Sequence, residues 1–163
     1  MKRSRLYDET RPTIKNRATS YKLAEGVYQE IDYAPQNAIY GEDNIYTTVE
    51  DMYYWDQALY PKKLVSAATL KEAFTPGKVN SGNDLYYGFG WMTSKTRGID
   101  TLSHGGGWLG FRTYIRRFPE RRLTVVVLSN LAQFRPGLVV SEISKIYWDD
   151  KKESEPASKS NPK

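Results

Sequence analysis

The stretch LSHGGGWLGFRTYIRRFPERRLTVVVLSN, residues Leu102–Asn130, contains the only histidine of the chain, His104, directly before three glycines. Strand-like apolar segments follow the glycines for most of twenty residues. Glycine weakens a strand, and it often marks a place where a ligand or another backbone comes close. The segment from His104 to Gly107 is therefore the first candidate for a functional site.

The same stretch predicts two strands joined by a tight turn. Residues Phe111–Phe118 alternate in strand fashion, and Pro119–Arg122 has the composition of a turn. Residues Leu123–Leu128 are apolar almost throughout, which is expected of a central strand covered on both faces. Upstream, Leu85–Lys95 is predicted as a glycine-punctuated strand and Asp100–His104 as a short one.

Two helices are predicted before these strands. Thr47 and Glu50 form a predicted capping box, and the helix that follows stops at Pro61. A second helix is predicted from Ser66 to the turn at Thr75–Gly77. The first helix has apolar side chains along one side, at Val49, Met52, Trp55 and Leu59.

A third helix is predicted to open at Pro136 and to close the domain. Residues 1–46 are predicted as extended loops. The order of helices, antiparallel sheet and closing helix predicts one α+β domain over residues 1–148. Residues 149–163 are charged and rich in proline and serine, so we expect a disordered tail there. The third helix is predicted to face inward with Val139, Ile143 and either Ile146 or Tyr147.

Composition excludes several classes of function. The 163 residues include no cysteine and one histidine, so disulfides, thiolate catalysis and ordinary metal sites have no support. The net charge is +5, but the basic residues are mixed with acidic ones, and no DNA- or RNA-reading element is found. No nucleic acid is therefore expected as a partner. The glycine run lacks the spacing of nucleotide-binding loops, and no cofactor is predicted. No signal-peptide segment is visible at the N-terminus, which leaves localisation open.

The residue types from His104 to Gly107 suit acyl transfer. A neutral imidazole can donate or accept a proton near pH 7. Bare glycine backbone lets a ligand approach main-chain N–H groups, which can bind a carboxylate or a developing oxyanion. The segment thus has the form of one wall of an acyl-transfer site. The alternative is a surface histidine before a glycine-rich bend that binds no ligand.

Four motifs occur in order, at Tyr87 (YGFGW), His104 (HGGGWLGF), Phe118 (FPE) and Val125 (VVVLSN). Together they resemble the C-terminal part of the serine β-lactamase and penicillin-binding protein superfamily. The resemblance is strongest to the branch of class C β-lactamases, D-alanyl-D-alanine carboxypeptidases and esterases. The stretch IYTTVEDMYYWDQAL, which begins at Ile45, also resembles a family helix, although Asp43-Asn44 replaces the usual Gly-Gly.

The resemblance implies the C-terminal portion of the β-lactamase/transpeptidase-like fold and roles for single residues. His104, Gly105 and Gly106 match the family's His-x-Gly triplet on the strand that lines the active site. Gly107 would supply the second N–H of the oxyanion hole. By its own position, directly after Gly-Phe at the rim, Arg112 could bind a substrate carboxylate, or it is a surface arginine on an exposed strand face. The implied reaction is hydrolysis of a small-molecule, peptide or ester substrate through an acyl-serine, without a cofactor. Intact relatives are often exported.

The nucleophile of this family is absent from the sequence. Its serine belongs to a Ser-x-x-Lys motif, which occurs here only at Ser160–Lys163, within the expected tail. No Tyr-x-Asn motif is present, and we attribute the Ser-x-Asn at Ser81–Asn83 to chance. The resemblance places both motifs N-terminal to everything seen here, so Met1 is expected to be an internal start. We expect this chain alone to be inactive.

A non-catalytic module is the alternative function. The glycine wall could bind a peptide or a carboxylate, or the strand at Leu123–Leu128 could accept a partner strand. In the resembled fold that strand pairs with one from the N-terminal part. Without it, an open apolar edge is expected to recruit the N-terminal half or a second copy, or to aggregate.

Overall fold

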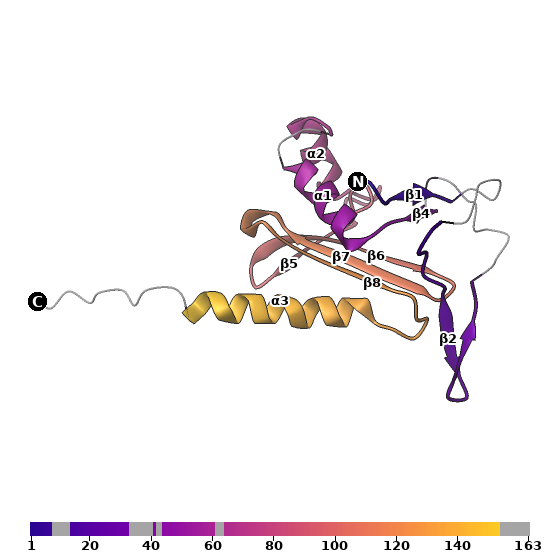
Figure 1. The fold of residues 1–163 in the computed structure, drawn as a ribbon. Helices are drawn as coiled ribbons and strands as arrows, with labels where there is room; N and C mark the ends of the chain where they lie inside the picture. Colours follow the sequence, from indigo (N-terminus) through magenta and orange to yellow (C-terminus); the bar gives the residue numbers. More distant parts are fainter. Residues whose placement is uncertain (8–13, 33–40, 42–43, 61–63, 154–163) are drawn as a thin grey trace, which may run out of the picture.

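The computed structural model describes residues 1–7, 14–32, 41, 44–60 and 64–153 (Figure 1). Its centre is a four-stranded antiparallel sheet in the order β5-β6-β7-β8, so each strand lies beside its neighbour in sequence. The strands span Met92–Thr96, Ile99–Trp108, Phe111–Phe118 and Leu123–Ser129. With helices on both faces of this sheet, the predicted α+β class is confirmed.

The two faces of the sheet are covered by different helices. Helix α3, Pro136–Glu153, packs against β7 and β8 on one face, and α1, Val49–Leu59, packs against β8 on the other (Figure 1). Helix α2, Ala67–Ala73, lies beside α1. Strand β8 is covered by a helix on each face, which accounts for its continuous apolar sequence.

The core on the α1 face is built from both sheet and helix residues. Trp91, Leu102 and Ile115 are buried there. Trp91 stacks on Trp55 of α1 with ring centroids 5.9 Å apart, and Phe74 meets it edge-on. Trp91, the last residue of the YGFGW motif, is thus a core residue.

A buried ion pair joins α1 to the sheet. Arg117 Nε donates to Asp56 Oδ1 at 2.6 Å, and both side chains are almost fully buried. The Thr124 hydroxyl donates to the same carboxylate oxygen at 2.8 Å. The Arg117 guanidinium also lies over the Tyr60 ring, 5.1 Å from its centroid. A buried carboxylate is stable only when it is paired and hydrogen-bonded, and Asp56 uses its partners for this. Asp56 therefore has a structural role.

The predicted helix starts are close to those observed. The N-cap of α1 is Thr48, whose side chain accepts from the Asp51 N–H, so the predicted cap at Thr47 is wrong by one residue. The Thr47 hydroxyl instead bonds that of Ser4. Helix α2 begins after Ser66 as predicted, with the Ser66 side chain as its cap.

Helix α3 differs from its prediction in face and length. Its inward side carries Val140, Ser144 and Trp148. Of the predicted inward residues, Ile143 is exposed and Val139 is half-buried; of the two alternatives, Ile146 is exposed and Tyr147 is half-buried. Contacts with β7 select this face: the Tyr114 ring lies close to Gly137, Arg116 donates to the Ser141 hydroxyl, and Phe118 meets Trp148 edge-on.

The helix also continues to Glu153, past the boundary at residue 149 where the tail was expected to begin. Lysine and glutamate favour helix, so the charged composition of this stretch does not stop α3. Residues 154–163, which contain the Ser-x-x-Lys at the end of the sequence, lie outside the described residues.

The prediction of extended loops over residues 1–46 is wrong in part. Strands β2 and β3, Tyr21–Ala24 and Val27–Glu30, form a hairpin. Its turn residues Glu25 and Gly26 both have positive φ, as a type I′ turn requires. The short strands β1, Arg5–Leu6, and β4, Ile45–Tyr46, pair with each other.

Candidate active-site wall

The glycine run is part of a strand, where the sequence indicated only a short strand before a bend. Strand β6 continues through Gly105, Gly106 and Gly107 to Trp108, paired throughout with β7. Regular cross-strand pairing therefore overrides the weak strand propensity of glycine. The predicted strand over Leu85–Lys95 is correspondingly shorter, since β5 begins only at Met92.

The outer edge of β6 is unpaired from His104 onward. Strand β5 pairs with Ile99–Ser103 and goes no further, because its first residue, Met92, lies opposite Ser103. Within the described part of the chain, no other strand continues along His104–Trp108 on that side. This segment therefore combines a histidine, bare backbone and a free strand edge.

The strand register determines which glycine N–H groups point toward the free edge of β6. Trp108 and Phe111 close a two-residue turn, so they occupy a hydrogen-bonded position of the antiparallel ladder, and these positions alternate along β6. The β5–β6 turn, closed by Thr96 and Ile99, gives the same alternation. By this count, the N–H groups of Gly105 and Gly107 point away from β7, toward the free edge.

Side-chain space differs among the three glycines. A Cβ on Gly106 would lie 2.5 Å from the Thr113 hydroxyl, and one on Gly105 would lie 3.2 Å from the Tyr114 ring. On Gly107 the nearest atom would be 3.6 Å away, on the Arg112 guanidinium, which is an ordinary contact. Packing thus favours glycine at Gly106, whereas Gly107 has room for a side chain.

His104 has a partner that the sequence did not indicate. The hydroxyl of Tyr87 lies 2.8 Å from His104 Nε2, and the two ring centroids are 6.0 Å apart. Both side chains are exposed, so this pair borders solvent. Tyr87 is the first residue of the YGFGW motif. The occurrence of this motif before HGGGWLGF was the only feature of the sequence that could have linked Tyr87 to His104.

Arg112 is not brought to the side of the sheet that carries His104. Side chains alternate along β6, and Arg112 lies opposite Gly107, an odd number of residues from His104. Its guanidinium donates to the carbonyls of Leu109 and Phe111, at 2.9 and 2.6 Å. The structure therefore separates Arg112 from the imidazole by the thickness of the sheet.

The turn after the glycine run anchors the N-terminal segment. Leu109 has φ of 48°, an uncommon conformation for a branched side chain. A Cβ on Gly110 would lie 2.5 Å from Tyr21 N and 2.6 Å from its carbonyl oxygen. Only glycine permits this approach, so Gly110 positions the β2–β3 hairpin against the end of the wall.

Asp51 is a structural carboxylate. It accepts hydrogen bonds from the N–H groups of Lys2, Arg3 and Ser4 and from the Ser4 hydroxyl, at 2.6–3.0 Å. Burial raises the pKa of Asp51, but the bonds from Ser4 and from the backbone N–H groups outweigh it and lower this pKa to about 2. Asp51 and Asp56 are thus both committed to holding α1 in place.

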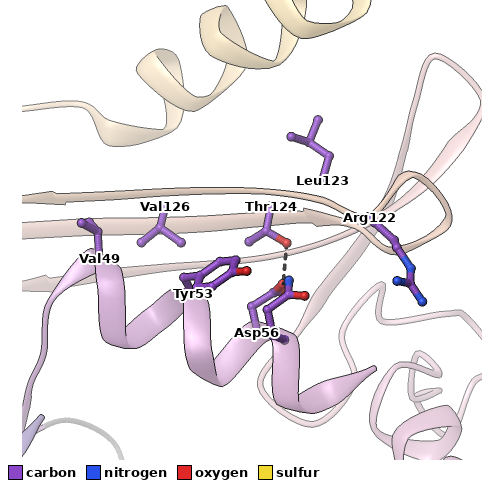
Figure 2. Close-up of a pocket in the computed structure, with 8 residues that line it drawn as sticks. Val49, Tyr53, Asp56, Arg122, Leu123, Thr124 and Val126 are labelled. Carbon is purple, nitrogen blue, oxygen red and sulfur yellow. Dashed lines mark hydrogen bonds between the residues drawn. The ribbon is translucent and has the colours of Figure 1, made fainter. Parts of the chain in front are cut away.

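Two cavities lie away from His104. One, of about 370 Å³, is lined by Tyr21, Tyr28, Asn130 and Leu131. The other, of about 270 Å³, lies between α1 and β8. Figure 2 shows Val49 and Tyr53 of α1 beside Val126 and Thr124 of β8, with Leu123 on the opposite side of the strand. This groove borders the free edge of β8.

Other expected features are quickly placed. Ser81–Asn83 lies in an exposed turn that the Lys78–Asp84 bridge closes. Among the described residues, no three His, Asp or Glu side chains gather closely enough to hold a metal ion. None of the described helices is long and apolar enough to cross a membrane.

The α+β sheet with a helix on each face is the architecture expected from the family resemblance. The sequence matches the Beta-lactamase family over residues 1–140, and the chain belongs to that family, in the serine β-lactamase and penicillin-binding protein superfamily. This establishes a serine hydrolase relationship and confirms the family resemblance.

Individual relatives agree with this assignment. Penicillin-binding protein 4* of Bacillus subtilis is 36% identical over 96 residues, which cover 58% of this chain and 21% of that protein. D-aminopeptidase of Gluconobacter oxydans is 27% identical over 90 residues, 55% of this chain and 17% of the relative. The chain thus spans about a fifth of the length of these relatives.

A solved structure shares the fold. The crystal structure of a penicillin binding protein from Bacillus halodurans superposes with a TM-score of 0.68 at 21% identity, covering 88% of this chain and 44% of that one. At this identity the likeness concerns the fold alone.

Proposed function

We propose that this chain forms the C-terminal wall of the active site of a β-lactamase-related serine hydrolase. In the complete site, an amide or ester is cleaved through an acyl-serine intermediate. His104 lies near the acyl carbon, and the Gly107 N–H donates to the oxyanion. The observation that supports this most directly is the free edge of β6 at His104–Trp108, with the Gly107 N–H pointing outward by the ladder count. Arg112 is left out because it projects from the other face.

In this proposal the nucleophile belongs to a Ser-x-x-Lys segment other than these 163 residues. The one Ser-x-x-Lys they contain, Ser160–Lys163, is not that segment. Nucleophile, base and oxyanion donors must lie within hydrogen-bond reach of one another. The chain alone should therefore remain unmodified, by intact mass, after incubation with a fluorophosphonate or a penicillin. A folded sample that gained one probe mass would show that a reactive serine exists here and would overturn the proposal.

The role of Gly107 can be tested in an assembled site. We would join the chain to a segment of a penicillin-binding protein that carries the Ser-x-x-Lys and Tyr-x-Asn motifs, and follow acylation by a fluorescent penicillin. Gly107→Pro removes the N–H without removing a ladder bond, because that N–H faces the free edge. We expect acylation to slow by roughly 10²–10³-fold, the usual effect of losing one oxyanion donor.

Gly107→Ala is the matched control, since it keeps the N–H and its Cβ meets nothing closer than 3.6 Å. It should acylate at nearly the parental rate. Equal slowing by alanine and proline, with both proteins folded by circular dichroism, would assign the effect to backbone distortion and contradict the oxyanion role.

A second candidate function is a strand-pairing interaction module. It is favoured by the edge of β8, which has no strand partner within the described residues and is uncharged from Leu123 to Ser129. The groove between α1 and β8 borders this edge. The partner would be a further segment of the protein or a second copy of the chain. A failure of the assembled site to acylate, with association through β8 retained, would favour this function over the hydrolase wall.

A further inference from the structure

We propose that Tyr87 is a positioning residue of this site, which holds His104 in the tautomer protonated at Nδ1. This inference rests on the proposed function only for its catalytic consequence. The structural part rests on the 2.8 Å contact between the Tyr87 hydroxyl and His104 Nε2. In a neutral imidazole one nitrogen donates and the other accepts, and the partner of one nitrogen decides the state of both.

The direction of this hydrogen bond follows from donor strength. A phenolic O–H is a more acidic donor than the N–H of a neutral imidazole, so Tyr87 donates and Nε2 accepts. Nδ1 then carries the hydrogen. His104 then offers an N–H donor rather than a base, so in the proposed site it would polarise an acyl oxygen rather than remove a proton.

Tyr87 is held by backbone contacts on both sides. Its carbonyl accepts from the Gly77 N–H at 2.9 Å, and the Tyr86 carbonyl accepts from the Thr93 N–H at 2.8 Å. Gly88 lies so close to α2 that a Cβ there would be 2.2 Å from the Ala73 carbonyl oxygen. These contacts fix the loop that carries Tyr87, so its hydroxyl has a defined position.

The backbone beside Tyr87 is unusual. Tyr86 has φ of 53°, in the left-handed region that an aromatic residue rarely adopts. Such conformations persist where surrounding contacts enforce them, and they cluster at functional sites. Because Met92 is the first residue of β5, the Tyr87 side chain meets His104 where the pairing of β5 with β6 ends.

The single histidine makes the test direct. In uniformly ¹⁵N-labelled chain at pH 9, where imidazole side chains are neutral, the two ring nitrogens give one set of long-range ¹H–¹⁵N signals. We expect Nδ1 to have the shift of a protonated nitrogen. In Tyr87→Phe, the population protonated at Nε2 should rise at least threefold. Tyr86→Phe, in an exposed neighbour with no contact to His104 in this structure, should leave the spectrum unchanged.

A parental spectrum dominated by protonated Nε2, or identical spectra for the parent and Tyr87→Phe with amide spectra intact, would overturn the proposal. Acylation in the assembled hydrolase supplies the second readout, and Tyr87→Phe should slow it while Tyr86→Phe does not. If no acylation occurs but the tautomer shifts as expected, the proposed function fails and the positioning of His104 stands. Parental acylation in Tyr87→Phe would overturn its catalytic consequence alone.

Discussion

At the scale of the residue, carboxylates with no catalytic geometry prove to hold the molecule together. Asp51 accepts hydrogen bonds from three backbone N–H groups and a hydroxyl of Lys2, Arg3 and Ser4, just before β1, and Asp56 pairs with Arg117 within the core. Sequence alone could not reveal these long-range partners, which lie 47 to 68 positions away.

Asp51 should make stability depend on pH in a defined window. Its folded pKa of about 2 lies below the usual aspartate pKa of 3.8, so its ionised form stabilises the fold above about pH 3.8, and this contribution is lost as the pH falls toward 2. We expect Asp51→Asn to be less stable than the parent at pH 7, with the difference shrinking between pH 3.8 and 2. Urea unfolding at several pH values measures this.

The control for Asp51 is Asp84→Asn. Asp84 is half-exposed and its ion pair with Lys78 is 3.7 Å long, so this change should have little effect on stability at any pH. A deficit of Asp51→Asn that stayed constant down to pH 2 would show that shape, rather than ionisation, is what Asp51 provides.

Only part of the candidate site could be predicted from the sequence. His104 and its glycines stand out because one histidine and one glycine run occur together in the sequence. The positions of Tyr87 and Arg112 could be known only from the structure. Tyr87 is seventeen positions before its partner His104, and Arg112 lies opposite Gly107, whose position in β6 puts Arg112 on the other face of the sheet from His104. Neither fact follows from composition or motif spacing.

At the scale of the element, strands and helices with a clear apolar pattern were predictable. Strand β7 has the predicted bounds, and α1 and α2 lie between their capping and stop signals. The β2–β3 hairpin was missed because its strands are largely exposed and show no alternation. The face of α3 was misjudged because apolar residues lie on two of its sides and the shape of β7 selects between them.

The turn between β6 and β7 provides a prediction at this scale. Gly110→Ala would place a Cβ within 2.6 Å of backbone atoms of Tyr21, which cannot give way as a side chain can. We expect a loss of about 1–3 kcal/mol in the free energy of unfolding. We also expect faster hydrogen exchange at the Tyr21 N–H, which the Asn130 carbonyl protects.

Gly107→Ala lies in the same hairpin, and its Cβ would meet only ordinary contacts. Its free energy of unfolding should stay within about 1 kcal/mol of the parent. If both variants lost equal stability, the close approach of Gly110 to Tyr21 would not be the cause.

At the scale of the whole molecule, helices cover both faces of the sheet, while none of the described strands pairs with the outer edge of β8. The family profile spans most of the chain, yet the chain spans only 44% of the solved structure it resembles. Sequence predicted this open edge at Leu123–Leu128 through the family resemblance. The apolar sequence alone indicated a central strand. A strand covered by helices on both faces is equally apolar whether it lies in the middle of the sheet or at its edge.

The open edge should make the protein self-associate. We expect light scattering to show dimers or larger species at micromolar concentration, and we expect Leu128→Lys to shift the population toward monomer. Leu128 is 37% exposed on the edge strand, where a lysine opposes strand addition.

Leu138→Lys makes the same change on the exposed side of α3. It should leave association through the β8 edge largely intact. A monodisperse parent, or equal monomerisation by both lysines, would show that β8 is not the associating surface.

The stacking of Trp55 on Trp91 gives the molecule an optical reporter of its own. One indole belongs to α1 and the other to the residue before β5, so their coupling exists only while α1 is docked on the sheet. Detachment of α1 would therefore change the near-ultraviolet circular dichroism even if the four strands kept their pairing. Local opening at this helix could be followed spectroscopically, apart from global unfolding and without any added label.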